Sequence, residues 1–274
     1  MRKLYLTLLA LVAIAFIGAA ALLVLPLLIR DGAAYMTTAN PDAAVATLTV
    51  SERPDLRPDM PASLSYTPDV TGAESFRILD GVTPRRWWGY APDDLSGPAP
   101  LILLFHGAGR DGLSMIDMWQ AVADENGLVL VAIDDINGAP GEIPDGGFLQ
   151  QVIEAASAAY PIDRDRMFLF GHSAGAVTAQ LVANRVIGPW RGAAVHAGYV
   201  NPAQLLRIDD APPVRHYLGT SDNIFDVEGA RISADYMARA GHDFDLILIP
   251  GHTHWFYEGG PDFAADAWAW FQTL

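Results

Sequence analysis

The chain has 274 residues, with 32 acidic against 17 basic side chains, a formal net charge of −15 and no cysteine. This charge, without any cluster of Lys or Arg, would repel a phosphate backbone and excludes nucleic acid as an expected partner. The lack of cysteine excludes a disulfide framework, so stability must come from burial of an apolar core.

The amino terminus is an uncharged apolar span. Arg2 and Lys3 precede residues 4–29, which exceed the roughly 20 residues that a helix needs to cross a bilayer. The apolar region of a cleaved signal peptide is usually shorter, so residues 1–30 are predicted to be an uncleaved signal anchor, a transmembrane helix; cleavage near residues 18–21 or 31–34 is the alternative. The basic residues before the span predict an extracytoplasmic domain, anchored at the membrane on the periplasmic face in a bacterium, or secreted.

Residues 31–70 differ in composition from the rest of the chain. They are rich in Ala, Thr, Pro and Asp, and five prolines from Pro41 to Pro68 would interrupt any helix. We therefore expect a mostly irregular tether that leads to a domain over residues 71–274, with some of its residues lying against that domain.

Within that domain, strand-like apolar runs alternate with helical patterns. This alternation predicts an α/β fold with a mainly parallel sheet covered by helices on both faces, and places catalytic groups at the carboxyl ends of the strands. Residues 198–213, between two strands, are too few for a large cap domain. Strands are expected at 87–90, 101–105, 128–133, 167–170, 193–197, 214–218 and 246–249, and helices at 113–126, 147–159, 174–186, 227–240 and 261–273.

The strand at 101–105 runs into His106-Gly107-Ala108-Gly109. At this place a backbone N–H pair can face a developing oxyanion, and the amides of Ala108 and Ala174 are the predicted donors. His106 is expected to hydrogen-bond the loop that it begins.

The strand at 167–170 is followed by Gly171-His172-Ser173-Ala174-Gly175, a G-x-S-x-G pattern. A serine hydroxyl becomes a good nucleophile when a tight strand-to-helix turn exposes it and a base takes its proton. Glycines at both ends allow the two backbones to approach closely. Ser173 is the candidate nucleophile, and His172 is expected to pack beside it without acting as the base.

Two later strands end at candidate partners for this serine. Asp222 follows the strand at 214–218 and is the candidate acid, whereas Asp226 is better interpreted as the N-cap of the next helix. The order serine, aspartate, histidine along the chain is that of α/β-hydrolases among the serine-triad folds.

Two histidines follow the strand at 246–249, in Pro250-Gly251-His252-Thr253-His254-Trp255. His254 is the favoured base, because the turn after the last strand can swing its imidazole over the serine, and His252 is the alternative base. Trp255 is a candidate pocket residue because it adjoins His254. The other histidines show no metal-ligand spacing.

From about Arg85 to the C-terminus, these motifs resemble the secreted polyhydroxybutyrate depolymerase and feruloyl esterase group of the α/β-hydrolase superfamily. The resemblance implies ester hydrolysis through an acyl-serine, with Ser173, Asp222 and His254 in the catalytic positions. The resembling residues are those of 99–107, 123–131, 145–149, 160–167 and 171–175.

The sequence therefore predicts a serine hydrolase of small-molecule or polymeric carboxylic esters, with a polyhydroxyalkanoate, feruloyl or other small-acyl group. It has no phosphate loop, dinucleotide fingerprint or metal-ligand spacing, so no cofactor and no metal are expected. Two alternatives remain open: a serine peptidase of the prolyl-oligopeptidase type, which shares the residue order, and a non-catalytic, membrane-tethered binding protein.

Overall fold

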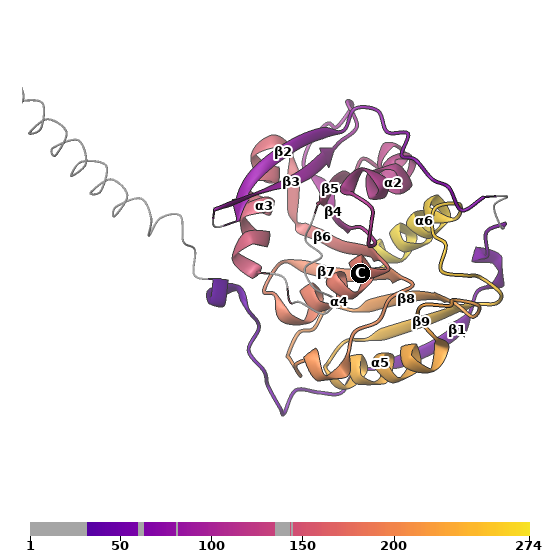
Figure 1. The fold of residues 1–274 in the computed structure, drawn as a ribbon. Coiled ribbons are helices and arrows are strands. Elements are labelled where there is room, and N and C mark those ends of the chain that lie inside the picture. Colours follow the sequence, from indigo (N-terminus) through magenta and orange to yellow (C-terminus); the bar gives the residue numbers. More distant parts are fainter. Residues whose placement is uncertain (1–31, 60–62, 81, 135–142, 144) are drawn as a thin grey trace, which may run out of the picture.

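The computed structural model describes residues 32–59, 63–80, 82–134, 143 and 145–274. Within them the strands form one sheet, in the order β1-β9-β8-β7-β6-β4-β5-β3-β2 (Figure 1). The strands are β1 (Leu48–Glu52), β2 (Glu74–Asp80), β3 (Thr83–Tyr90), β4 (Ala99–Phe105), β5 (Val129–Ile133), β6 (Ile162–His172), β7 (Trp190–His196), β8 (Val214–Gly219) and β9 (Phe244–Ile249). The helices are α2 (Gly112–Asn126), α3 (Gly146–Ala159), α4 (Ala174–Arg185), α5 (Val227–Arg239) and α6 (Gly260–Phe271), with short 3-10 helices η1 (Gly32–Tyr35), η2 (Pro54–Leu56) and η3 (Pro202–Gln204).

The sheet is mainly parallel, as predicted. Neighbouring strands are parallel along the stretch β1-β9-β8-β7-β6-β4-β5. Strand β3 then pairs with β5 and with β2 in the antiparallel sense. Each strand and helix expected from residue 87 onward is present, with ends that differ by a few residues.

Helices cover both faces of the sheet, because the strand side chains alternate between two apolar cores. Leu101, Leu103 and Phe105 of β4 face the core that contains α3, α4 and α5. Ile102 and Leu104 face the core that contains α2 and α6. Strands buried on both faces read as the continuous apolar runs that made them recognisable in the sequence.

The connection between β7 and β8 is short, as expected. It contains η3 as its one regular element, so no cap domain is inserted at this point of the chain. The carboxyl ends of β6, β8 and β9 are therefore not covered by an inserted domain at this connection.

Residues 31–70, expected to be a mostly irregular tether with some residues lying against the domain, contribute an edge strand to the sheet. Leu48–Glu52 form β1, which pairs in parallel with β9 at the edge of the sheet, and Arg53 N–H continues the pairing to the carbonyl of Leu248 at 2.9 Å. The free edge of β9 offers hydrogen-bonding groups to a proline-free run that includes β-branched residues. The segment is thus part of the sheet built by the predicted 71–274 domain.

The described residues contain no helix that is both long and apolar enough to cross a bilayer. The predicted membrane span at residues 4–29 lies outside the described residues.

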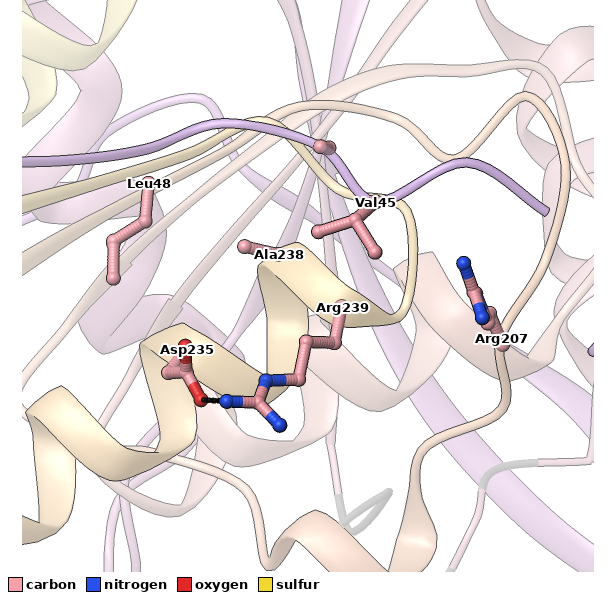
Figure 2. A pocket seen from close by; sticks show the side chains of 7 residues that line it. Val45, Leu48, Arg207, Asp235, Ala238 and Arg239 are labelled. Atoms are coloured by element: carbon pink, nitrogen blue, oxygen red, sulfur yellow. Dashed lines mark ion pairs between the residues drawn. The ribbon is translucent and has the colours of Figure 1, made fainter.

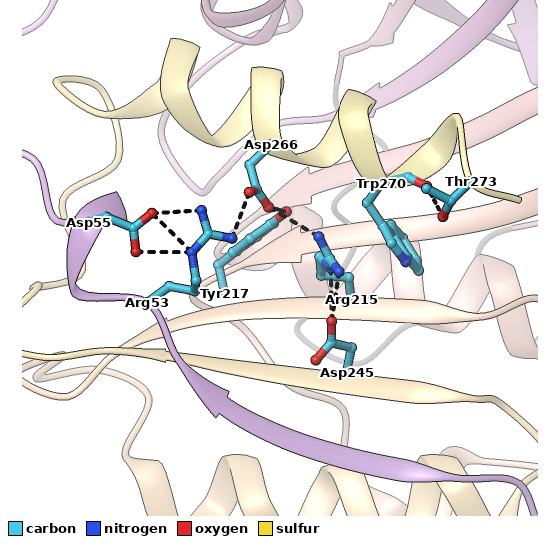
Figure 3. Close-up of polar contacts among 8 residues, drawn as sticks. All are labelled: Arg53, Asp55, Arg215, Tyr217, Asp245, Asp266, Trp270 and Thr273. Atoms are coloured by element: carbon cyan, nitrogen blue, oxygen red, sulfur yellow. Dashed lines mark hydrogen bonds and ion pairs between the residues drawn. The ribbon is translucent and has the colours of Figure 1, made fainter.

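An ion-pair network joins the N-terminal segment to the end of the chain (Figure 3). Asp266 on α6 accepts hydrogen bonds from Arg53 Nη1 at 2.9 Å, Arg215 Nη1 at 3.2 Å and the Tyr217 hydroxyl at 2.6 Å. Arg215 also pairs with Asp245 of β9 at 2.8 Å. One carboxylate thereby connects the residue after β1 to β8 and α6.

Replacing Asp266 with Ala is expected to lower the free energy of unfolding by about 3 kcal/mol, because it leaves two guanidinium groups and a hydroxyl without their shared acceptor. Asp235→Ala is the matched control, since its ion pair with Arg239 at 2.8 Å borders an open groove at α5 (Figure 2) and its side chain is 47% exposed. The control should change stability by less than about 0.5 kcal/mol. Urea unfolding measures both, and equal effects would contradict the interpretation of the network.

Candidate active site

Ser173 occupies the sharp turn between β6 and α4. Its backbone has φ 56° and ψ −119°, a conformation that non-glycine residues rarely adopt. The turn is held from both sides, since Ser173 N–H donates to the carbonyl of His196 at 2.9 Å and the Ser173 carbonyl accepts from Ala176 N–H at 2.9 Å. This geometry presents the hydroxyl at the carboxyl edge of the sheet.

The glycines of the G-x-S-x-G pattern are required by close backbone contacts. A Cβ on Gly171 would collide with the carbonyl of Gly175, and a Cβ on Gly175 would collide with the carbonyl of Phe105 at the end of β4. The turn between β6 and α4 therefore packs against β4 only when both positions lack a side chain.

The structure brings together the three side chains proposed from the sequence. The Ser173 hydroxyl lies 2.9 Å from Nε2 of His254, and Nδ1 of His254 lies 2.9 Å from Oδ2 of Asp222. They come from the ends of β6, β8 and β9, which meet at one edge because these strands are parallel. With Nδ1–H donating to the carboxylate, Nε2 is free to accept the serine proton.

The carboxylate of Asp222 is buried, and hydrogen bonds stabilise its ionised form. Its side chain is fully buried, which alone would raise its pKa, but the hydrogen bond from His254 and two backbone N–H groups lower the pKa below its usual value. These N–H donors, Ile224 and Phe225, lie 2.8 and 2.9 Å from Oδ1. Asp226 instead caps α5 by accepting from Gly229 N–H at 2.8 Å, as the sequence indicated.

The alternative base His252 is not placed at the nucleophile. Its Nε2 is hydrogen-bonded to Nε2 of His196 at 2.8 Å, and the residue is 2% exposed. The chain turns at Gly251, where φ is 74°, and the imidazole that lies beside Ser173 is the one two residues after His252. Of the two histidines, His254 is therefore the one that lies within hydrogen-bond distance of the Ser173 hydroxyl.

Ala108 and Ala174, the expected oxyanion donors, lie on two segments that adjoin Ser173. Ala174 is the first residue of α4, and Ala108 lies in a turn closed by Arg110 N–H to the carbonyl of Gly107 at 3.2 Å. A Cβ built on Gly107 would lie 3.3 Å from Cβ of Ser173, so this turn adjoins the serine. Within the described residues neither alanine amide donates to another backbone group outside regular elements.

Trp255, the candidate pocket residue, is half-buried beside His254. Its ring packs edge-on to Tyr257 at 5.4 Å, and the guanidinium of Arg110, from the Ala108 turn, lies over the rings of Trp255 and Tyr257. The ring of Phe225 stacks on His254, with ring centroids 5.9 Å apart. Phe225 is thus the aromatic side chain that packs on His254 itself, whereas Trp255 contacts Tyr257 and Arg110.

Sequence reasoning missed a group of buried histidines at the same edge of the sheet. His172 and His196 end β6 and β7, and His252 follows β9. His172 packs beside the nucleophile as expected, and stacks on Phe256 at 4.7 Å. The signal that could have found the group is its position, since all three residues lie at or just beyond the carboxyl ends of predicted parallel strands.

Comparison with known proteins gives a distant relative and many similar folds. No family model matches the chain. A bifunctional acetylxylan esterase/xylanase of Neocallimastix patriciarum is 26% identical over 149 residues, which cover 51% of this chain and 22% of that protein. The chain therefore matches less than a quarter of the length of this relative.

Solved esterase structures share the fold at low sequence identity. Esterase 2 of Thermogutta terrifontis, phosphonylated by cyclosarin, superposes with a TM-score of 0.61 and 17% identity, over 77% of this chain and 97% of that one. An S-formylglutathione hydrolase from Agrobacterium tumefaciens superposes with a TM-score of 0.58 and 16% identity, over 76% of this chain and 98% of that one. A thermostable esterase superposes with a TM-score of 0.59 and 16% identity, over 73% of this chain and 62% of that one. The fold of the described residues is that of the α/β-hydrolases, as the sequence predicted.

Proposed function

We propose that the protein is a serine hydrolase that cleaves carboxylic esters through an acyl-serine intermediate. The observation that carries this proposal is the continuous hydrogen-bonded path from Asp222 through His254 to Ser173, with both distances at 2.9 Å. The fold shared with solved esterases and the distant acetylxylan esterase relative support it.

In the proposed reaction, Ser173 Oγ attacks the ester carbonyl carbon while His254 Nε2 takes the hydroxyl proton. Asp222 holds the imidazole in the tautomer with Nδ1 protonated and stabilises the imidazolium that forms. The imidazolium then gives its proton to the leaving alcohol oxygen, and the carbon–oxygen bond of the ester breaks. A water molecule then attacks the acyl carbon while His254 Nε2 takes one of its protons. The imidazolium returns this proton to Ser173 Oγ as the bond between the acyl carbon and Oγ breaks, which releases the carboxylic acid and restores the serine.

The negative charge of the tetrahedral intermediate requires donors that are already in place. The amides of Ala108 and Ala174 fill this role in the proposal, because one lies in the turn beside Ser173 and the other begins α4 at its positive end. Each such donor contributes about 3 kcal/mol to the transition state in well-studied cases.

The substrate class that we propose is an ester with a small or planar acyl group, in a polymer or a small molecule. The lack of an inserted cap between β7 and β8 favours a chain-like substrate, such as a polyhydroxyalkanoate or a feruloylated or acetylated polysaccharide. The Neocallimastix relative is named for action on acetylxylan, and Thermogutta esterase 2 has been solved with propionate bound.

Turnover of matched ester and amide substrates tests this function. We expect hydrolysis of 4-nitrophenyl acetate at least about 100-fold faster than release of nitroaniline from 4-nitroacetanilide. Turnover that falls as the acyl chain lengthens from acetyl to octanoyl would support the small-acyl class. Faster cleavage of a peptide amide would favour the peptidase alternative, and no turnover of any substrate would favour the binding protein.

We also propose that residues 4–29 anchor the protein in a membrane, with the hydrolase on the extracytoplasmic side. The full chain is expected to resist extraction by alkaline carbonate, and the variant Ala15→Arg/Ile17→Arg to be extracted, because each arginine at the centre of a span costs about 3 kcal/mol. Release of the unaltered chain would instead indicate cleavage and secretion.

A further inference from the structure

Three buried imidazoles form a hydrogen-bonded row beside the proposed triad, and the reaction above does not use them. Nδ1 of His172 lies 3.0 Å from Nδ1 of His196, and Nε2 of His196 lies 2.8 Å from Nε2 of His252. The three residues are at most 5% exposed. This row, His172–His196–His252, is called the histidine chain below.

At one end, the histidine chain is attached to the nucleophile. His172 directly precedes Ser173, and its ring lies 5.2 Å from the ring of His254. The main-chain carbonyl of His196 accepts the N–H of Ser173 at 2.9 Å, so this residue fixes the strained turn by its backbone while its side chain joins the other two imidazoles.

At the other end, the histidine chain is attached to the base and the acid. His252 lies two residues before His254 in the same turn. Its carbonyl accepts the N–H of Ser221, the neighbour of Asp222, at 2.9 Å. Every turn that carries a member of the proposed triad is therefore linked to one of the three histidines.

The imidazole of His196, at the centre of the histidine chain, takes part in both hydrogen bonds as a neutral ring. A neutral imidazole carries one N–H donor and one acceptor nitrogen, so His196 donates to one neighbour and accepts from the other. It is packed against Phe256 and Phe263, with ring centroids 5.1 and 4.6 Å away, and this apolar surrounding disfavours a charged ring. Loss of this one side chain breaks both hydrogen bonds and disconnects the two ends.

We propose that the histidine chain is a positioning unit that fixes the turn carrying His254 against the turn carrying Ser173. Its members touch neither the hydroxyl nor the substrate in the proposed reaction; they act through the residues that do. The kinetic consequences rest on the proposed ester hydrolysis, whereas the geometric role does not. Small misplacements of a catalytic group cost up to about 100-fold in rate, so the loss is expected in kcat.

The variant His196→Phe, with His216→Phe as the matched control, tests the proposal in the full chain. Both histidines are completely buried on neighbouring strands, and both changes place the same ring in the core. Neither ring nitrogen of His216 has a hydrogen-bond partner within the described residues, so the control removes a buried imidazole without breaking a link. Steady-state kinetics on 4-nitrophenyl acetate and the far-downfield proton NMR signal of the His254 Nδ1–H are measured for both.

We expect His196→Phe to lower kcat by about 30-fold with KM within about 3-fold, and to broaden or remove the downfield signal. His216→Phe should keep both kcat and the signal. Equal behaviour of the two variants, or an unchanged signal in His196→Phe, would overturn the proposal. If the unaltered protein turns over no ester, the proposed function fails, and the NMR comparison still decides the positioning role.

A second pair of variants, at His252 at the end of the histidine chain, tests the proposal if His196→Phe does not fold. His252→Gln keeps a donor and an acceptor near the position of Nε2, whereas His252→Leu keeps neither. The glutamine variant should retain at least about half of the kcat, and the leucine variant should lose about 10-fold, while both keep KM within about 3-fold. Equal kcat in these two variants would contradict the role of the hydrogen bond.

Discussion

Replacing Ser173 with Ala is expected to lower kcat for 4-nitrophenyl acetate by at least about 10⁴-fold, because no acyl-enzyme can form without the hydroxyl. The change removes one oxygen from a half-buried side chain, so the thermal unfolding midpoint should stay within a few degrees. Activity equal to that of the unaltered protein would dispose of the assignment of Ser173 as nucleophile.

The two aspartates near the end of β8 offer a matched comparison for the acid. Asp222→Asn should reduce kcat by about 10³- to 10⁴-fold, because an amide at this place favours the wrong tautomer of His254. Asp226→Asn should leave kcat within about 2-fold, since asparagine also caps a helix well. A larger loss from Asp226→Asn than from Asp222→Asn would show that the acid has been assigned incorrectly.

The protein is expected to lose stability in mild acid, because it buries several histidines in their neutral form. Burial lowers the pKa of His172 to about 3 and the pKa values of His216, His242 and His252 to about 4, and it lowers the pKa of His196 well below 6.5. In the unfolded chain these groups titrate near 6.5, so below that pH the unfolded state binds more protons than the folded state. Stability is therefore complete above about pH 6.5 and decreases as the pH falls toward 4.

The size of this effect follows from linkage. A lowering from 6.5 to about 4 corresponds to about 3 kcal/mol for a fully buried histidine such as His216. Together the five lowered pKa values correspond to a loss comparable to the whole 5–15 kcal/mol stability of a typical domain, so we expect unfolding above pH 4. Urea unfolding between pH 7.5 and 4.5 measures the slope, and His216→Phe should make it shallower by about one proton. A free energy of unfolding that is constant over this range would contradict the buried, neutral state of these histidines.

The parts of the fold that the sequence predicted are those with local signals. The continuous apolar runs of β4, β5 and β6 are buried on both faces, and the glycines at 171 and 175 mark a turn that tolerates no side chain. Once the parallel strands are recognised, Asp222 and His254 follow, because they stand just beyond strand ends.

The parts that could not be predicted depend on partners far away in the sequence. Strand β1 forms because the edge of β9, almost 200 residues later, is free to pair with it, and nothing in residues 48–52 identifies that edge. The hydrogen bonds of His172 to His196 and of His196 to His252 join residues 24 and 56 positions apart, with no periodic spacing. The shared role of Asp266 likewise depends on Arg53 and Arg215 meeting at one carboxylate.

Covalent labelling tests most directly whether Ser173 is activated by His254. A fluorophosphonate probe followed by peptide mass spectrometry should place a single adduct on Ser173 in the full-length protein. The adduct should form at least about 100-fold more slowly in His254→Ala, in which the hydroxyl loses its acceptor at 2.9 Å. An unlabelled serine at 173, or equally fast labelling with and without the imidazole, would contradict the proposed active site.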